Sequence, residues 1–548
     1  MLMLQLLGWM LATLGALPLA YVLSTQLYRH DIDPERSHGQ VFLTTALLWM
    51  LLQAAVVEGL LVAHAFALQP LLILEGLAAI LGIVLLRRVL ARNRPIVVAQ
   101  HNMSLPVCLL LALGLVLLYL LATRPLTDFD SLAYHVPTLE GWLRSGHHAA
   151  PPGFESDQVG AYPYAWEAVC TPSQLIGRST FLLLLPNLLA WSAFGVAVSL
   201  LGRAHGASAP ASQLAALLLM CQPLCIEQVG TLHVDLPFAA LLVAGVYYAQ
   251  RWARQGAAAD VVMTWVCAAL LCAVKMSGLP YAAMLVSLGV GLRWWLRSSL
   301  LVAQQQTPKS SMDLFVQLGV SVVAGGVGAM FYLLNWARLG NPLGYVPVRL
   351  GSWVLFAGRA EFLQQVEQTT LWHLFHFRDL HHLLVLGKVC AFYLGLPFVA
   401  LLLLATVAQR QSLRLMWAHL LWFTCAVLYF RTPYGGDNGS HGWQITTWIG
   451  QGLRFALPAL GILASVAATG ADAVLRIRPL RRALAVTPVL LVIARTIASE
   501  QLQQLGIKLD TTMGIKTLLV GELAAVGLAA VVVGVMERAL PRHLSAGQ

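Results

Sequence analysis

Long apolar runs recur along the whole chain, and they restrict the fold more than any other feature of the sequence. A helix that crosses the hydrocarbon core of a bilayer needs about 20 mostly apolar residues. Runs of this kind begin near residues 3, 41, 69, 105, 181, 212, 236, 259, 279, 314, 384, 414, 455, 483 and 516. Since lipid offers the backbone no hydrogen-bond partners, such runs fold as helices. The pattern therefore predicts an all-α polytopic membrane protein with about 15 transmembrane helices.

The composition agrees with this fold class and excludes a soluble domain of the same size. Hydrophobic residues make up 58% of the 548 residues and charged residues only 11%, whereas a soluble domain carries about 25% charged residues. The 34 Lys and Arg residues outnumber the 24 acidic residues. In a membrane protein this excess is typical of a basic cytoplasmic face, so we expect a lipid bilayer and no nucleic acid as partner.

Lys and Arg residues are concentrated in every second connection between the apolar runs. Short basic loops of this kind include 87–94, 251–254, 293–309 and 476–482. Such loops stay on the cytoplasmic side, so the long connectors that alternate with them should face outward. These connectors are 124–180, 336–383, 431–454 and 499–515. With spans rich in Leu, Ala and Arg, the chain is expected in a bacterial inner membrane, with its active site facing the periplasm.

The stretch "LTDFDSLAYH" (126–135) opens the first long outward connector directly after an apolar run. It places Asp128 and Asp130 at the membrane boundary. Apolar residues follow at helical spacing, which predicts a short amphipathic helix on the membrane surface. A partly desolvated carboxylate held there can act as a general base toward a hydroxyl group.

The acids of this stretch and the tyrosine behind them resemble the first outer loop of GT-C glycosyltransferases. That family includes the protein O-mannosyltransferase and aminoarabinose-transferase-like groups, and its loop often has the pattern Asp-Glu-x-x-Tyr. Asp130 stands four residues before Tyr134, as the family's catalytic acid does, and Ser131 replaces the usual second acid. Asp128 is an additional acid two residues upstream, so the choice between the two aspartates stays open.

Further stretches resemble the family in the same order along the chain. They are "YPYAWEAV" (162–169), "HVDLPFAALLVAGVYY" (233–248) with Asp235, "AVKMSGLPYAAML" (273–285) with Lys275, "LGNPLGYVP" (339–347) with Asn341, and "GLRFALPAL" (452–460) with Arg454. The resemblance implies a GT-C-like core with short amphipathic outer-face helices. It also implies a hexosyl- or pentosyltransferase that uses a polyprenyl-phosphate sugar as donor and a glycan, lipid or protein as acceptor.

The resemblance also implies roles for individual residues, in an inverting reaction. Asp130, or Asp128, would be the aspartate base. The donor's phosphate and lipid would be bound by Lys275, Arg454, His233 and Asp235. Other substrate contacts would come from Tyr134, His135, Tyr162, Tyr164 and Asn341, with Trp142 and Trp166 as further stacking surfaces. Some branches of the family depend on a divalent cation, so Mg²⁺ or Mn²⁺ is possible, but the sequence assigns no metal ligands.

Plainer interpretations of these residues remain open at this stage. Lys275 could be an interface residue that reaches toward water, Arg454 could pair with a loop acid such as Asp437, and Asp235 could cap a helix before Pro237. A transporter or flippase of lipid-linked sugars is one alternative function. A polymerase or ligase of the O-antigen type is another, which would rely on outer-loop arginines such as Arg349, Arg359 and Arg378.

The position of the acidic loop predicts the domain organisation. In the family this loop normally follows the first span, whereas here it follows the fourth. Residues 1–95 are therefore expected to be an added N-terminal module of three helices. Residues 96–470 would form the catalytic core, and 471–548 the C-terminal transmembrane helices.

Overall fold

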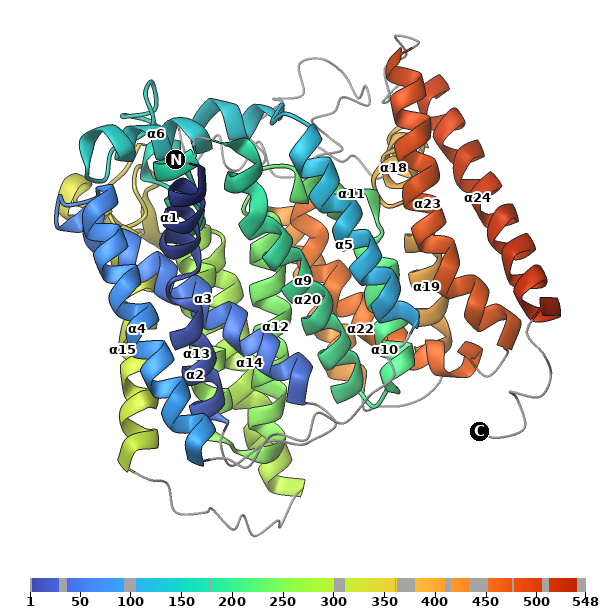
Figure 1. Ribbon diagram of the computed structural model, residues 1–548, viewed down its shortest axis with the longest axis horizontal. Helices are drawn as coiled ribbons and strands as arrows, with labels where there is room; N and C mark the ends of the chain where they lie inside the picture. The colour runs from blue at the N-terminus through green and yellow to red at the C-terminus, as the bar shows by residue number, and fades with distance from the viewer. Residues whose placement is uncertain are drawn as a thin grey trace. The chain divides into compact units, whose positions relative to one another are not determined.

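The computed structural model describes most of the chain (Figure 1). The described residues are 2–28, 37–92, 105–177, 179–299, 311–359, 361, 380–409, 415–432, 452–475, 478–504 and 512–539. Contacts divide the chain into two compact units, and each is described by itself. Unit 1 comprises Met1–His101, Leu118–Leu200 and Gln228–Gln365, and unit 2 comprises Asn102–Leu117, Leu201–Glu227 and Val366–Gln548.

Nearly all described elements are helices. In chain order the elements are α1 (Leu2–Leu14), α2 (Leu17–Leu27), α3 (Ser37–Val62), α4 (Leu68–Arg92), α5 (Leu105–Thr123), η1 (Ser131–His135), α6 (Val136–Ser145), η2 (Gln158–Ala161), α7 (Ala165–Cys170), α8 (Pro172–Gly177), α9 (Thr180–Ala204), α10 (Ala209–Met220), α11 (Pro223–Val229), α12 (Asp235–Gln255), α13 (Ala258–Val274), α14 (Gly278–Ser299), α15 (Ser311–Leu339), β1 (Val348–Leu350), β2 (Trp353–Phe356), α18 (Leu380–Tyr393), α19 (Gly395–Gln409), α20 (Met416–Arg431), η4 (Gly452–Ala456), α22 (Leu457–Leu475), α23 (Arg478–Gln504) and α24 (Thr512–Ala539). The strands β1 and β2 form an antiparallel pair.

Within the described residues, 8 helices are long and apolar enough to cross a membrane, and the number rises to 10 if each of two bent helix pairs is one span. Every predicted span begins within five residues of the first residue of a described helix. The largest difference, five residues, separates the run predicted near residue 483 from Arg478, where α23 begins. The prediction of an all-α, multi-pass membrane protein is confirmed. The total of about 15 spans stays a prediction.

The central helix of unit 1 is α12, whose residues are buried without interruption from Asp235 to Arg251. It packs against α13 and α14, and α13 packs in turn against α15 (Figure 1). Gly245 allows the close approach of α14, because a Cβ atom at this position would lie 2.4 Å from Leu285 Cδ2. A helix that is buried all round belongs to the interior of a bundle. The residues at the two ends of α12 are therefore held in fixed positions.

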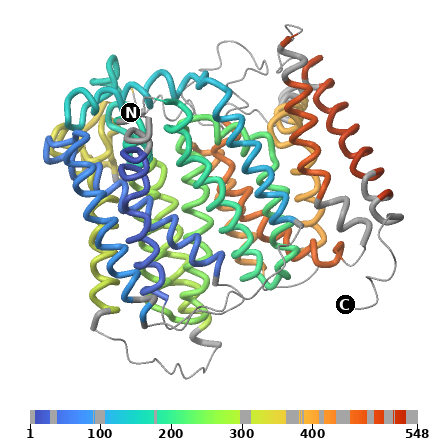
Figure 2. Tube along the Cα trace, in the orientation of Figure 1, coloured from blue at the N-terminus to red at the C-terminus, as the bar shows by residue number. Residues whose placement is uncertain are grey.

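The first four helices belong to the same compact unit as α12. They pack against one another, and α3 also contacts α7, α13 and α15 (Figure 2). Trp49 and Gln53 of α3 donate hydrogen bonds to the carbonyl groups of Thr13 and Ala12, at 2.9 and 3.1 Å. The predicted domain boundaries near residues 95 and 470 stay predictions. Unit 1 contains residues on both sides of the boundary near residue 95.

Unit 2 is arranged around α22, which is buried from Leu457 to Ala471. This helix packs against α10, α19 and α20. The helices α10 and α11 meet at an angle of 70°, and α18 and α19 meet at 104°. Arg495 of α23 pairs with Glu522 of α24 at 3.1 Å, which neutralises both charges within the helices.

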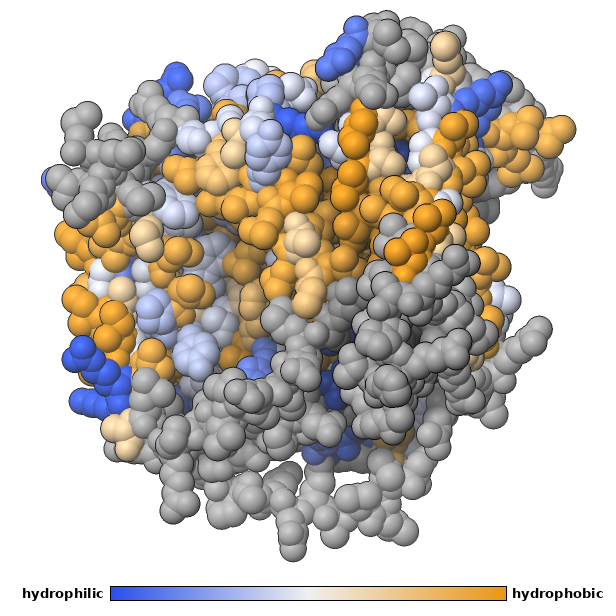
Figure 3. Space-filling model, turned by 45° about the vertical axis from the view of Figure 1, so that its right-hand side comes forward, coloured by the Kyte–Doolittle hydropathy of each residue, from blue (hydrophilic) through white to orange (hydrophobic). Residues whose placement is uncertain are grey.

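Large apolar side chains cover much of the described surface (Figure 3). On α14 and α15 they include Trp294, Phe315 and Val322, which are 79%, 74% and 65% exposed. Apolar surface of this extent needs lipid or protein as cover. Much of the second and third outward connectors lies outside the described residues, namely residues 360, 362–379 and 433–451.

A buried polar cluster joins the last part of α12 to α2, α3 and α13. The Arg251 Nε atom donates to both carboxylate oxygens of Asp260, at 3.1 and 3.2 Å. Its Nη1 atom donates to Gln40 Oε1 at 3.0 Å, and the Tyr28 hydroxyl donates to Asp260 Oδ1 at 2.8 Å. Asp260 is completely buried and Arg251 is 4% exposed. The pairing removes the cost of burying either charge alone.

We predict that Asp260→Ala lowers the free energy of unfolding by about 3–5 kcal/mol, because it leaves a buried guanidinium without its carboxylate. The measurement is unfolding of the purified protein in detergent, followed by tryptophan fluorescence. Glu140→Ala is the control, since it removes the exposed pair between Glu140 and Arg144 and should change the same free energy by less than about 0.5 kcal/mol. Equal stability of the two variants would contradict the assignment.

Candidate functional site

The acids Asp128 and Asp130 lie together with His233 in unit 1. His233 Nε2 is 2.9 Å from Asp128 Oδ2 and 3.7 Å from Asp130 Oδ2. The His233 side chain is 3% exposed, and those of Asp128 and Asp130 are 11% and 19% exposed. His233 is thus placed with the acids, although the sequence predicted it as a contact of the donor phosphate.

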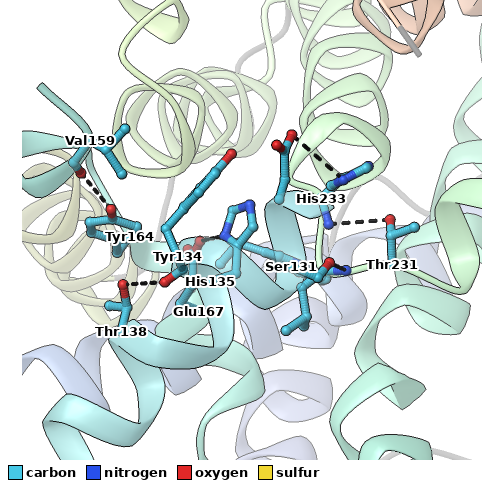
Figure 4. Close-up of polar contacts among 12 residues, drawn as sticks. Ser131, Tyr134, His135, Thr138, Val159, Tyr164, Glu167, Thr231 and His233 are labelled. Carbon is cyan, nitrogen blue, oxygen red and sulfur yellow. Dashed lines mark hydrogen bonds and ion pairs between the residues drawn. The ribbon is translucent and has the colours of Figure 1, made fainter. Parts of the chain in front are cut away.

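Hydrogen bonds from backbone amides to side-chain oxygens order the acidic loop and join it to the segment that leads into α12. The Ser131 Oγ atom accepts from the Leu232 amide at 2.8 Å, and the Ser131 amide donates to Asp128 Oδ2 at 2.9 Å. The Thr231 Oγ1 atom accepts from the His233 amide at 3.3 Å (Figure 4). Ser131 therefore joins the two halves of the site.

His233 keeps Asp128 in its charged form. Burial raises the pKa of the Asp128 carboxyl, but the hydrogen bond and charge of His233, together with the bonds from Ser131, lower it more. The pKa of Asp128 consequently lies below its usual range, as expected where hydrogen bonds favour the charged form of an acid. Asp128 Oδ1 is buried and has no hydrogen-bond partner among the described residues.

A second carboxylate–histidine pair lies next to the acids and was not predicted. Glu167 of α7 pairs with Nδ1 of His135, the last residue of η1 (Figure 4). Both side chains are buried, and the rings of His135 and His233 are 6.4 Å apart. The available signal was that Glu167 is an acid inside the otherwise apolar stretch "YAWEAV".

Lys275 and Asp235 form a close ion pair at the same end of α12 and α13. The Lys275 Nζ atom is 2.6 Å from Asp235 Oδ1, and the two side chains are 23% and 6% exposed. Val234 is the N-cap residue of α12 and makes no side-chain cap bond, so the geometry favours the pair over a capping role for Asp235. His233 and Asp235 are two residues apart, and they link the acids to the cation.

Asn341 organises the loop that follows α15. Its Nδ2 atom donates to the carbonyl groups of Val346 and Ala357, both at 2.9 Å, and its Oδ1 accepts from the Leu343 amide at 2.9 Å. The side chain is 1% exposed. This amide is largely used within its own loop, whereas the sequence predicted a substrate contact.

Gln158 connects this loop to the rest of the site and was also missed. Its Nε2 atom donates to the Leu343 carbonyl at 3.0 Å, and its Oε1 accepts from the Tyr345 amide at 2.8 Å. The Nε2 atom also lies 3.4 Å from the sulfur of Met276, the residue after Lys275. Gln158 therefore couples the first outward connector to the Lys275 segment.

The predicted aromatic contacts divide into accessible and buried rings. Tyr134 is half-buried and Tyr162 is 36% exposed. Tyr164 is buried, and its hydroxyl donates to the Val159 carbonyl at 2.5 Å. Trp142 and Trp166 are each 1% exposed. Of the five, only Tyr134 and Tyr162 have a ring surface available to a sugar.

Arg454 belongs to unit 2, whereas the other predicted site residues belong to unit 1. It lies in η4, is 6% exposed, and its guanidinium stacks on Phe455 at 5.1 Å from the ring centre. Its predicted partner Asp437 lies outside the described residues. Within the described part of the chain, no three His, Cys, Asp or Glu side chains are grouped as ligands for a metal ion.

Comparison with known proteins gives a distant likeness in fold. No protein-family model and no curated protein matches the sequence. Two solved structures are similar, namely ArnT from Cupriavidus metallidurans bound to undecaprenyl phosphate and the same protein in the apo state, with TM-scores of 0.42 and 0.43. Each is 16% identical, over 78% of this chain and 77% of the ArnT chain. The proposals below rest on the site geometry and on the sequence motifs.

We predict that Asn341→Ala loosens the loop from 339 to 359. The variant leaves buried backbone groups without partners, which costs about 1–3 kcal/mol and should increase protease cleavage within the loop roughly tenfold. Mass spectrometry of the fragments measures the cleavage rate. Asn341→Asp, which keeps the acceptor but loses both donors, should be intermediate, and unchanged cleavage in both variants would show that the amide does not hold the loop.

Proposed function

We propose that the protein is an integral-membrane glycosyltransferase. It moves a hexose or pentose from a polyprenyl-phosphate-linked donor to a hydroxyl group of a glycan, lipid or protein. The observation that carries the proposal is the segment 233–235, where His233 contacts the acid pair and Asp235 contacts Lys275. A proton acceptor is thereby held close to a cation. These are the two groups that glycosyl transfer from a phosphate needs.

Of the two acids, Asp130 is better suited to be the base. Asp128 is the less exposed one, is bonded to the Ser131 amide, and is closer to His233. A carboxylate held by several donors is a weak proton acceptor, because those donors favour its charged form. Asp128 is therefore assigned to hold His233, and Asp130 to take the proton.

The reaction follows from this assignment. Asp130 accepts the proton of the attacking hydroxyl group while the hydroxyl oxygen bonds to the anomeric carbon of the donor. The bond from this carbon to the phosphate oxygen breaks on the opposite face, and its electron pair leaves with the polyprenyl phosphate. Attack and departure on opposite faces give inversion at the anomeric carbon.

Lys275 is assigned to the phosphate of the donor. Its partner Asp235 keeps the ammonium group positioned and charged, and the Lys275 side chain is 23% exposed, so a phosphate oxygen can reach it. A cation at this place stabilises the negative charge that grows on the leaving phosphate. Tyr134 and Tyr162 are kept as proposed contacts of the sugar, and the role of Arg454 in phosphate binding stays the prediction made from the sequence.

The site residues lie at helix ends, which favours an enzyme over a transporter. Asp130 follows the end of α5, Asp235 begins α12, and Lys275 follows the last residue of α13. Transporters of lipid-linked substrates place their polar groups near the bilayer midplane. For the polymerase alternative, Arg359 is bonded to the Ser156 carbonyl at 3.1 Å and stacked on Tyr345, while Arg378 lies outside the described residues. We propose that this end of the helices faces the periplasm, in the inner membrane of a bacterium.

The first test uses protein in liposomes that contain polyprenyl-phosphate hexose or pentose donors, with release of polyprenyl phosphate as readout. Asp130→Asn should lower the transfer rate by about 10²- to 10⁴-fold, the usual contribution of a general base. Asp128→Asn should lower it less. Asp157→Asn is the control, because Asp157 caps η2 in the same connector and Asn also caps well. Full activity of Asp130→Asn, or an inactive wild type with every donor, would refute the proposal.

A second prediction concerns Lys275. Lys275→Met should lower kcat/KM for the donor roughly 10- to 150-fold, the effect of losing about 1.5–3 kcal/mol of a charged hydrogen bond. Because this variant removes the cation that pairs with the buried carboxylate of Asp235, Lys275→Met combined with Asp235→Asn should restore thermal stability without restoring kcat/KM. Recovery of activity in the double variant would show that the pair is only structural.

A further inference from the structure

The helix turn that carries the acids is wider than an α-helical turn. η1 is a π-helix, in which the Val136 amide bonds to the Ser131 carbonyl five residues back. In an α-helix with 3.6 residues per turn, residues five apart differ in direction by about 140°. A turn that closes on the fifth residue instead makes this difference smaller and turns His135 more toward the side of Asp130. Such turns occur frequently at functional sites.

Contacts with His233 support this placement independently. The rings of His135 and His233 are 6.4 Å apart, and His233 Nε2 is 3.7 Å from Asp130 Oδ2. The Tyr134 ring lies 4.3 Å from that of His135, and Figure 4 shows both side chains pointing to the same side of the loop. His135 is therefore part of the surroundings of the acids.

Glu167 determines which nitrogen of His135 carries the proton. A carboxylate only accepts hydrogen bonds, so Nδ1 of His135 must donate to it. The neutral ring then has its lone pair on Nε2, and no described residue donates a hydrogen bond to this atom. Glu167 is 1% exposed, so water competes little for the bond. The backbone of Glu167 is held in α7, where its carbonyl accepts a hydrogen bond from the Thr171 amide at 2.8 Å.

The titratable groups that face His135 come from three elements. Glu167 comes from α7, Tyr134 lies beside it on η1, and His233 precedes α12. Asp128 and Asp130 both lie close to Nε2 of His233. No Lys or Arg of the described residues pairs with His135, whose only charged partner among them is Glu167.

We propose that His135 is a second proton acceptor of the transfer reaction and that Glu167 is its positioning residue. The inference rests on the proposed function. The proton leaves the attacking hydroxyl for the Asp130 carboxylate, and the Asp130 O–H bond then breaks as the Asp130 side chain turns toward His135 and the proton passes to Nε2 of His135. Asp130 becomes charged again for the next turnover, and the imidazolium is stabilised by Glu167 until it releases the proton to solvent.

The first experiment reads the tautomer without any substrate. ¹⁵N spectra of ring-labelled histidine are recorded in lipid nanodiscs near pH 8.5, about two units above the ordinary histidine pKa, and His135→Asn identifies the signal. The wild type should show hydrogen on Nδ1, and Glu167→Leu should shift the population toward hydrogen on Nε2. Cys170→Ala, a buried change on the same helix, should leave the wild-type spectrum. Hydrogen on Nε2 in the wild type would overturn the proposal.

The second experiment measures transfer with a donor that the wild type uses. His135→Asn and Glu167→Leu should each lower kcat by about 10²-fold or more, as for loss of a proton acceptor, with little change in KM. Glu167→Asp should recover part of kcat, and Cys170→Ala should match the wild type. Wild-type kcat in His135→Asn would overturn the role in transfer while leaving the proposed function standing. An inactive wild type, in contrast, would overturn both.

Discussion

The cost of placing charge next to lipid governs the arrangement of this protein. An ionisable group at a membrane is tolerated when it pairs with another group or faces water, and the charged residues at the two ends of α12 follow this rule. Lys275 pairs with Asp235, and Arg251 pairs with Asp260. The histidines of the site each pair with a carboxylate. These paired groups form two clusters, one at each end of α12, and the residues of α12 between them are apolar for most of its length.

The helix α12 connects these two clusters and fixes the geometry of the candidate site. Asp235 begins it and Arg251 lies near its end, so their Cα atoms are separated by about 24 Å along the helix axis at 1.5 Å per residue. Every residue between them is buried. Because the far end is clamped by Asp260, Gln40 and Tyr28, the near end has little freedom to move. The candidate site residues on the loops at this end are therefore supported by a rigid helix.

The sequence predicts the helices well because hydropathy is a local property. It predicts the partners of the site poorly, because a partner depends on tertiary contact: Lys275 lies 40 residues from Asp235, and His135 lies 32 residues from Glu167. The wide turn of η1 also has no signature in "SLAYH", whose spacing suits an α-helix. Asn341 holds its own loop together through its side-chain amide, which its position in the motif did not indicate, and its contact with a substrate stays a prediction.

The two aspartates of "LTDFDSLAYH" differ because of what surrounds them, although the sequence presents them alike. The amide of Ser131 and the ring of His233 hold Asp128 in its charged form, and this makes it a poor proton acceptor. The same ring lies farther from Asp130, whose side chain is also the more exposed. If an acid stood in place of Ser131, the Leu232 amide would lose the hydroxyl to which it is bonded. Asp128 and Ser131 therefore form one arrangement with His233. In it Asp128 holds the histidine, and Asp130 remains available for chemistry.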